Sequence, residues 1–369
     1  MAASSISLKT KIYFLVGNNP HQTAPHFSRQ LSDALQRQGI ETRLYWIDEG
    51  HFFHAFYDIL EDPPDCTCSF SQILVGQKRL GDLWRIPHLS FLIDSAIYFT
   101  PHFEGNYSWI SCVDQDNCAF VRSRNFNSVF FLPHAAEKEI LTLPHDHRTY
   151  EVAFFGSCVD IDACERRWRG YPMAKKERLY ALAERVLSPQ GISLYQAIQE
   201  IGVHQEEFLH YYQEIELYIR GKDRIELIRS IQDQEVHIWG PGPWKRYCPQ
   251  AIVHSSISFE ETLLKMRETK IVLNSSPSFK KGAHERLFYA LLSGCCVLTG
   301  ESAFVNHHFV PGKEILTYRF GEYSHDLKGA FSSWKEIALA GQQKVLTEHT
   351  WDHRAKDVID FLISKKNIK

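Results

Sequence analysis

The chain has 369 residues, of which 44% are hydrophobic and 23% are charged, and its 41 basic residues nearly balance 44 acidic ones. This length exceeds what a single hydrophobic core organises, so two domains of about 150–200 residues are expected. A net charge of −3 gives no electrostatic basis for binding nucleic acid, and we expect no nucleic-acid partner.

The apolar runs, the N-terminal residues and the cysteines bear on the cellular location of the protein. No apolar run approaches the ~20 residues that span a bilayer, which excludes a transmembrane segment but leaves peripheral membrane contact open. Residues 1–11 lack the apolar core of a signal peptide. The nine cysteines are odd in number and follow no repeating interval, so reduced thiols explain them best. Together these features predict a cytoplasmic protein.

The first half alternates strand and helix patterns. A strand is expected at residues 11–17 (KIYFLVG), a helix from the spacing of Phe27, Leu31 and Leu35, and a second strand at residues 42–47 (TRLYWI). This βαβ order implies a parallel sheet with a right-handed crossover. Further short strands are expected at residues 72–75, 89–93, 109–113 and 128–132.

The second half repeats this alternation after a polar connection at residues 133–149, which carries two prolines and three histidines. A long helix is expected at residues 206–231, broken or bent near Gly221. Strands are expected at residues 151–156, 235–239, 251–254, 270–273 and 295–299, and the other helices at residues 178–187, 260–267 and 284–293.

We therefore predict an α/β protein of two tandem Rossmann-like domains, at residues 1–148 and 149–346, with a cleft between them. An amphipathic C-terminal helix follows at residues 347–369, and its packing back on the N-terminal domain is left open. Ligands of parallel α/β sheets bind outside the carboxyl ends of the strands, because helix N-termini there present free N–H groups.

The most informative segment is residues 270–318. A buried strand leads into the polar loop 275–282, which has three serines, two lysines and a glycine and opens directly onto a helix. The N–H groups at the helix start, with Lys280, Lys281 and Arg286 nearby, would form a cradle for a diphosphate. An ordinary βα loop carrying solvated charges explains the same pattern equally well on physical grounds alone.

This segment resembles the donor-binding core of group-1 glycosyltransferases, particularly their CgeB-like branch. The resemblance rests on Asn274-Ser275, on the run from Gly282 to Phe288 (GAHERLF), on Leu292-Ser293-Gly294 and on residues 309–314 (FVPGKE). Elements elsewhere resemble the family in the same order, at residues 91–99 (FLIDSAIYF), 130–135 (FFLPHA), 154–157 (FFGS), 237–244 (HIWGPGPW) and 349–354 (HTWDHR).

The resemblance implies a GT-B fold that transfers a sugar from a nucleoside diphosphate donor, with UDP or GDP expected. It implies no obligate metal or other cofactor, and an unidentified glycan, lipid or protein acceptor. By position, it assigns the border of the base to Gly240, Pro241 and Gly242. It assigns the donor phosphates to Gly156, Ser157, Lys281, Gly282, His284, Glu285 and Arg286.

The chain departs from the family at two acidic positions. Related enzymes often carry glutamates where this chain has Lys281 and Tyr289, and the second glutamate holds the ribose hydroxyls. Their absence supports a second hypothesis, a GT-B-like nucleotide-binding or scaffold protein that no longer transfers sugar. A two-domain epimerase is a third. The Gly17-Asn18-Asn19 turn lacks the remaining glycines of a dinucleotide fingerprint, which disfavours an NAD enzyme.

A general base for the acceptor hydroxyl would lie in the first domain. His21, Asp94 and Asp114 are the candidates, in that order, although a loop histidine or a capping aspartate is the commoner role for each. Residues 114–116 and 160–162 both spell D-x-D, the metal–diphosphate motif of the other major glycosyltransferase fold. The tandem βαβ layout favours the metal-free fold, so we expect no metal site.

Overall fold

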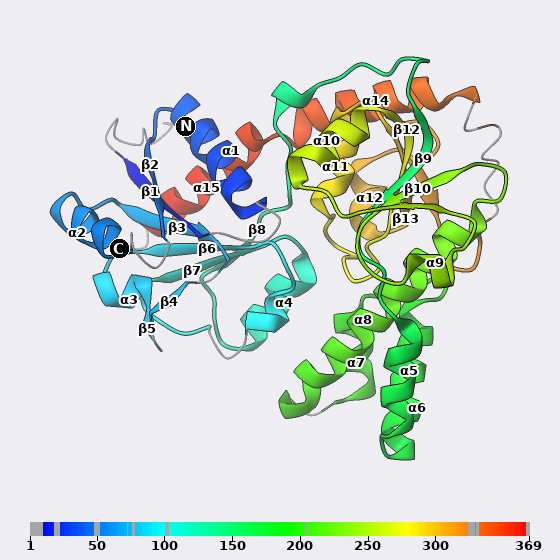
Figure 1. Cartoon of the computed structure of the whole chain (residues 1–369). Coiled ribbons are helices and arrows are strands. Elements are labelled where there is room, and N and C mark those ends of the chain that lie inside the picture. Colours follow the sequence, from blue (N-terminus) through cyan, green and yellow to red (C-terminus); the bar gives the residue numbers. More distant parts are fainter. Residues whose placement is uncertain are drawn as a thin grey trace. The chain divides into compact units, whose positions relative to one another are not determined.

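The computed structural model describes residues 10–17, 23–47, 52–71, 73–75, 78–99, 103–203, 205–323, 329 and 332–366. The chain divides into two compact units, one made of Met1–Glu137 with His349–Lys369 and the other of Lys138–Glu348. Each unit carries a six-stranded parallel sheet (Figure 1). The α/β prediction with two parallel sheets is confirmed. No described helix has the length and apolar character to cross a membrane.

The first unit has the strand order β2-β1-β3-β6-β7-β8, with every pair parallel. The order reverses between β1 and β3, as in a doubly wound sheet. Its elements are β1 (Lys11–Val16), α1 (Thr23–Arg37), β2 (Glu41–Trp46), α2 (Phe52–Glu61), β3 (Cys66–Phe70), β4 (Leu74–Val75), β5 (Lys78–Arg79), α3 (Leu80–Trp84), β6 (His88–Leu92), η1 (Ala96–Phe99), β7 (Ser108–Cys112), α4 (Gln115–Ser123), β8 (Val129–Phe131) and α15 (Trp351–Lys366).

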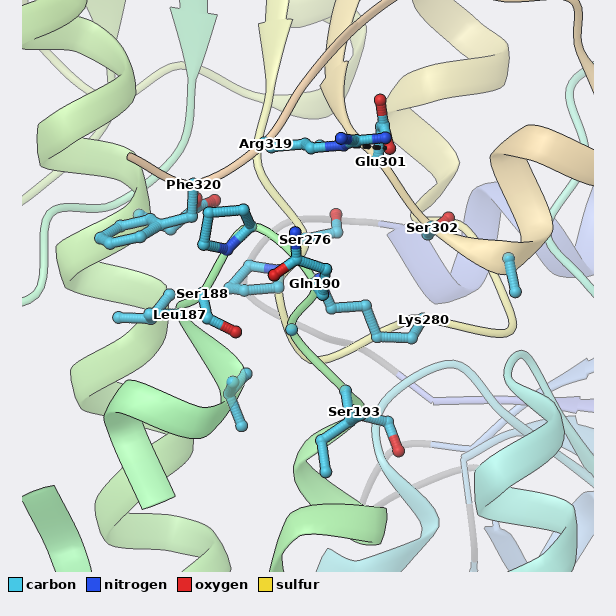
Figure 2. A pocket seen from close by; sticks show the side chains of 18 of the residues that line it. Leu187, Ser188, Gln190, Ser193, Ser276, Lys280, Glu301, Ser302, Arg319 and Phe320 are labelled. Atoms are coloured by element: carbon cyan, nitrogen blue, oxygen red, sulfur yellow. Dashed lines mark hydrogen bonds and ion pairs between the residues drawn. The ribbon is translucent and has the colours of Figure 1, made fainter. Parts of the chain in front are cut away.

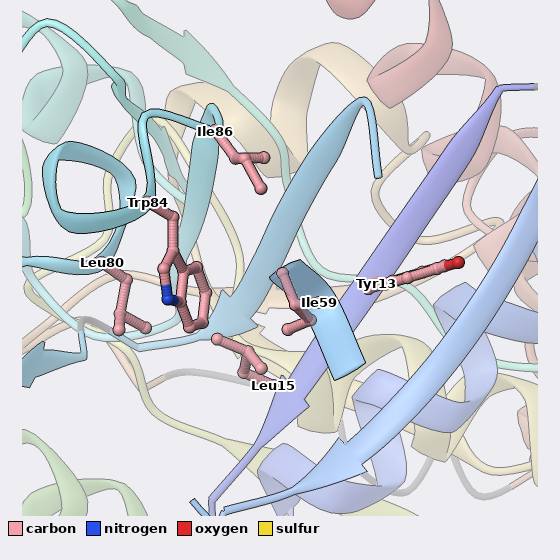
Figure 3. Close-up of a cluster of buried hydrophobic side chains, with 6 residues drawn as sticks. All are labelled: Tyr13, Leu15, Ile59, Leu80, Trp84 and Ile86. Atoms are coloured by element: carbon pink, nitrogen blue, oxygen red, sulfur yellow. The ribbon is translucent and has the colours of Figure 1, made fainter. Parts of the chain in front are cut away.

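The core of the first unit follows from the apolar spacing of its elements. Phe27 on α1 is fully buried and packs on Trp351 at the start of α15, with ring centroids 5.4 Å apart. Phe361 on α15 stacks on Phe130 of β8, with centroids 4.1 Å apart. A separate cluster of buried side chains joins the sheet to α2 and α3 (Figure 3), formed by Tyr13, Leu15, Ile59, Leu80, Trp84 and Ile86.

The central strand β3 was not expected, because its sequence CTCSF shows little apolar patterning. All five of its residues are nevertheless buried. The two hydroxyl groups of β3 are hydrogen-bonded to His88 on β6. His88 Nδ1 lies 2.9 Å from Thr67 Oγ1, and His88 Nε2 lies 3.0 Å from Ser69 Oγ. The strand expected at residues 72–75 is instead the short β4, which pairs with β5 in an antiparallel hairpin outside the main sheet.

Burial of His88 predicts that acid destabilises the protein. Burial lowers the pKa of His88 to about 4, so the folded state keeps this ring neutral while the unfolded chain protonates it near pH 6.5. The unfolded state binds more protons between these values, so stability is lost as pH falls from about 6.5 to 4, by up to ~3 kcal/mol. Urea unfolding at pH 7.5 and pH 5 measures this loss. In His88→Gln the loss should shrink, and an equal loss in both proteins would contradict the prediction.

The second unit has the strand order β11-β10-β9-β12-β13-β14, again all parallel. Its elements are η2 (Lys138–Ile140), β9 (Tyr150–Phe155), α5 (Ile161–Arg169), α6 (Met173–Val186), α7 (Leu194–Ile201), α8 (Gln205–Ser230), β10 (Val236–Trp239), α9 (Trp244–Tyr247), β11 (Ile252–His254), α10 (Phe259–Arg267), β12 (Thr269–Asn274), α11 (Glu285–Leu292), β13 (Cys296–Gly300), α12 (Ala303–His308), β14 (Leu316–Tyr318) and α14 (Trp334–Glu348).

Four helices, α5 to α8, are inserted between β9 and β10 and extend away from the sheet (Figure 1). The long helix α8 packs against the other three and continues through Gly221, where the sequence predicted a break or a bend. A Cβ at Gly221 would lie 2.7 Å from Ile161 Cγ2 and 2.9 Å from Val159 Cβ. The glycine therefore lets α8 approach the segment that follows β9.

Candidate functional site

The predicted donor residues of the second unit lie on loops at the carboxyl ends of β9, β10 and β12. Gly156 follows β9, Gly240 follows β10, and residues 275–284 follow β12 and lead into α11. These three strands are neighbours in the sheet, so their loops meet at one edge, where parallel α/β folds bind ligands.

The loops after β9 and β10 are packed backbone to backbone. Gly156 N donates to Trp239 O at 2.9 Å, and Cys158 N donates to Pro241 O at 2.8 Å. A Cβ at Gly240 would lie 2.1 Å from Gly156 O, and one at Gly242 would lie 2.3 Å from Cys158 O. Only glycine fits at both positions, so the residues assigned to the phosphates and to the base border are brought together here.

Arg286 lies in the first turn of α11. Its Nη1 donates to Asn274 Oδ1 at 3.4 Å, and its guanidinium carbon lies 5.7 Å from the centre of the Phe154 ring. His284 is the N-cap of α11, and its Nδ1 lies 2.7 Å from Glu285 Oε2. His284 and Glu285 thus engage each other beside the start of the helix.

A second arginine, which sequence reasoning missed, lies over the same ring. Arg224 on α8 places its guanidinium carbon 5.7 Å from the centre of the Phe154 ring. Its Nη1 donates to Ser157 O at 2.7 Å and to Ser157 Oγ at 3.2 Å. Two guanidiniums from distant parts of the sequence therefore share one aromatic ring between the loops after β9 and β12.

This arrangement concentrates positive charge in a poorly solvated place. Burial, and then the nearby charges of Arg286 and Arg220, lower the pKa of Arg224 to about 9. Burial also lowers the pKa of Arg286, although Glu285 opposes the shift. Both arginines remain charged at neutral pH, so an anion between them would relieve their repulsion and replace lost solvation.

Asp223, the residue before Arg224, fixes α8 to the sheet. Its Oδ2 accepts hydrogen bonds from Ser275 Oγ at 2.6 Å and Tyr318 Oη at 2.7 Å. Burial raises the pKa of Asp223 despite these bonds. Asp223 and Arg224 thereby connect α8 to the loops after β12 and β9. The one sequence feature that could have indicated this part of α8 was Gly221, since a glycine inside a helix often marks a close approach of another segment.

A cavity of about 330 Å³ lies beside these loops, within the second unit. Figure 2 shows Ser276 and Lys280 from the loop after β12, Glu301 and Ser302 from the loop after β13, and Arg319 and Phe320 after β14. Lys281 also lines the cavity and is exposed, whereas Gly282 is buried. The connection between α6 and α7 forms the remaining wall.

The candidate bases occupy different settings, and their roles stay predictions. His21 lies outside the described residues. Asp94 is exposed in the bend after β6. Asp114 is 1% exposed and is the N-cap of α4, where its Oδ1 accepts the Asp116 N–H at 2.8 Å.

Tyr289, where related enzymes often carry a glutamate, and the D-x-D triplet at residues 160–162 both have structural contacts. Tyr289 is completely buried, with its ring centroid 5.1 Å from that of Phe259, so this position belongs to the core. Asp160 caps α5 and accepts the Tyr247 hydroxyl at 2.6 Å, and Asp162 pairs with Arg246.

Comparison with known proteins identifies a family segment in the second half. Residues 222–360 match the model of a family described as glycosyl transferase-like. The match begins on α8 immediately before Asp223 and Arg224, and it includes β12 and α11. No curated protein sequence matches the chain significantly.

Solved structures share the fold across nearly the whole chain at low sequence identity. Sucrose-phosphate synthase from Thermosynechococcus elongatus has a TM-score of 0.56 at 9% identity, over 98% of this chain and 100% of that one. HepE from Anabaena, solved in complex with UDP-glucose, has a TM-score of 0.56 at 10% identity, over 96% and 99%. AviGT4, a glycosyltransferase of avilamycin A biosynthesis, has a TM-score of 0.54 at 10% identity, over 96% and 97%.

The fold shared with these structures is the GT-B glycosyltransferase fold, which confirms that prediction. Neither the family match nor the fold points to the CgeB-like branch in particular. Residues 222–360 thus match a family described as glycosyl transferase-like, and the chain shares the GT-B fold of these solved structures.

Proposed function

We propose that this protein transfers a sugar from a nucleoside diphosphate donor held by its second unit, without an obligate metal. The observation that carries the proposal is the pair of guanidiniums of Arg224 and Arg286 over Phe154, between the loops after β9 and β12. Fixed cations at this position would stabilise the negative charge that develops on the departing diphosphate. UDP-glucose is bound by HepE, which shares the fold, so UDP is the first donor nucleotide to test.

The acceptor side of the proposal is less specific. A general base would take the proton of the acceptor hydroxyl, and Asp94 is the exposed candidate among the described residues. We propose a glycan, lipid or protein acceptor and no nucleic acid, in keeping with the net charge of −3. The nine cysteines are all free and buried, which supports a cytoplasmic location.

The alternative function is binding of a nucleotide sugar without transfer. The burial of Tyr289 favours this alternative, because the position where relatives carry the ribose glutamate is part of the core here. The two functions differ in turnover. An enzyme would release nucleoside diphosphate from its donor when an acceptor is present, whereas a binding protein would only be stabilised by the nucleotide.

A thermal-shift screen against UDP, GDP, CDP, ADP and dTDP, with and without magnesium, tests the donor site. A ligand that binds only the folded state raises the unfolding midpoint by mass action. We expect one diphosphate to raise the midpoint equally with and without magnesium. A shift that requires magnesium would refute metal independence, and no shift with any nucleotide at millimolar concentration would refute the donor site.

Arg286→Ala is expected to weaken binding of that diphosphate by about 1.5–3 kcal/mol, because a hydrogen bond to a charged group is lost. Isothermal titration calorimetry measures the change in dissociation constant. Arg178→Ala, which removes an exposed arginine on α6, is the charge-matched control and should bind as the wild type does. An unchanged dissociation constant in Arg286→Ala would remove this residue from the site.

A further inference from the structure

The cavity beside the donor loops is lined by loops that follow the strands of the sheet and by the connection between two inserted helices. Ser276 and Lys280 come from the loop after β12, and Glu301 and Arg319 follow β13 and β14. The opposite wall is the connection between α6 and α7, at residues 187–193, which lies before the family segment at residues 222–360. The helical insertion therefore contributes one wall of this cavity, and the family segment contributes the rest.

One cation in this cavity, Lys280, has no directly contacting partner in the described part of the chain, although the carboxylates of Asp223 and Glu301 are near enough to act on its charge. The Lys280 ammonium makes no hydrogen bond or ion pair with any residue that the structure describes, although the side chain is partly buried. Ser276 Oγ is buried and likewise has no hydrogen-bond partner within the described ranges. An ammonium and a hydroxyl on the same cavity wall are together suited to an anionic oxygen group.

The acidic groups of the cavity are already engaged. Glu301 pairs with Arg319, with Oε2 and Nε 2.9 Å apart, as the dashed line in Figure 2 marks. The buried Asp223 accepts hydrogen bonds from Ser275 and Tyr318. Lys280 is thus the cavity cation that a ligand could contact directly, because Asp223 and Glu301 act on its charge without a hydrogen bond or ion pair to it.

The other polar groups suit a polyhydroxylated ligand. The wall between α6 and α7 contributes the hydroxyls of Ser188 and Ser193 and the amide of Gln190 (Figure 2), and amides and hydroxyls both donate and accept hydrogen bonds. A volume of about 330 Å³ lies within the range of small-molecule sites.

We propose that this cavity binds an acidic sugar, with its carboxylate on Lys280 and Ser276 and its ring hydroxyls toward Gln190 and Ser193. The inference rests on the proposed sugar transfer and names the class of sugar involved. A neutral sugar would leave the Lys280 ammonium without a directly bound anion, so the cavity discriminates by charge.

Saturation-transfer NMR with D-glucuronate, D-glucose and D-glucose 6-phosphate tests the proposal. We expect glucuronate to bind the wild type and glucose to bind at least about tenfold more weakly, as the loss of one charge-assisted hydrogen bond implies. Lys280→Met should weaken glucuronate binding by about tenfold to a hundredfold, and Ser276→Ala should weaken it less. Lys313→Met, at an exposed lysine outside the cavity, is the matched control.

Three results would overturn the proposal: glucose binding as tightly as glucuronate, glucuronate binding unchanged in Lys280→Met, or no binding of glucuronate at millimolar concentration. Tighter binding of glucose 6-phosphate than of glucuronate would also overturn it, because Lys280 would then serve a phosphoryl group. Nucleotide binding is measured separately on the same samples. Binding of a nucleoside diphosphate without glucuronate refutes this inference alone, and the converse result refutes the proposed donor site alone.

Discussion

Replacing Arg148 with alanine is expected to lower the free energy of unfolding of the second unit by about 3–6 kcal/mol, because hydrogen bonds from a buried charged group are lost. Arg148 is 5% exposed and donates to Thr269 O and Ser293 O, each at 2.7 Å. Its guanidinium carbon also lies 5.6 Å from the centre of the Trp334 ring. Alanine would leave buried carbonyls without donors and a void beside this ring.

Urea unfolding followed by far-UV circular dichroism measures this change. Arg148→Lys keeps the charge, but a lysine cannot reach carbonyls on both sides. Its free energy of unfolding should therefore lie between those of Arg148→Ala and the wild type. Arg185→Ala removes an exposed arginine paired with Glu200 at 3.2 Å and should cost less than about 1 kcal/mol. Equal costs for Arg148→Ala and Arg185→Ala would show that the carbonyl contacts of Arg148 contribute little.

Gly240→Ala is expected to lower the free energy of unfolding by about 3–5 kcal/mol. The new Cβ would lie 2.1 Å from Gly156 O, and φ at this residue is +157°. Because the obstacle is backbone, the loops after β9 and β10 would have to separate. Nucleotide binding should therefore weaken together with stability.

Gly312→Ala is the control that distinguishes the cost of a steric clash from the cost of a positive φ angle. Gly312 has a φ of +78°, and a Cβ there would meet nothing within 4 Å. This variant should therefore lose only the ~1–2 kcal/mol of a left-handed residue. Thermal midpoints and nucleotide dissociation constants of the two variants check the prediction. A cost for Gly240→Ala no larger than that for Gly312→Ala would contradict the close packing of the two loops.

The sequence predicted the parallel sheets well because most of their strands are apolar runs between glycines and polar turns. β3 was missed because Thr67 and Ser69 face the core, where His88 satisfies their hydroxyls. Hydrophobic periodicity cannot reveal a buried position whose polarity is satisfied by a residue some twenty positions away.

The candidate site was predicted only in part for a similar reason. Arg286 and the loop before α11 are continuous in sequence, so a strand, a polar loop and a helix start could be recognised together. Arg224 joins them from the middle of a long helix, through contacts with Ser157 and the Phe154 ring. Nothing in the local pattern of α8 distinguishes this arginine from a solvated one, and only the glycine at position 221 hinted at a close approach.

The discontinuous chain path of the first unit has a consequence for synthesis on the ribosome. The second unit is continuous from Lys138 to Glu348, so it can fold as soon as it emerges. The first unit must wait for Trp351 and Phe361, which cover Phe27 and Phe130. During that interval the six strands of the first unit, which are made early, expose the aromatic surface that α15 later covers. The half that is translated first is thus the half that finishes folding last.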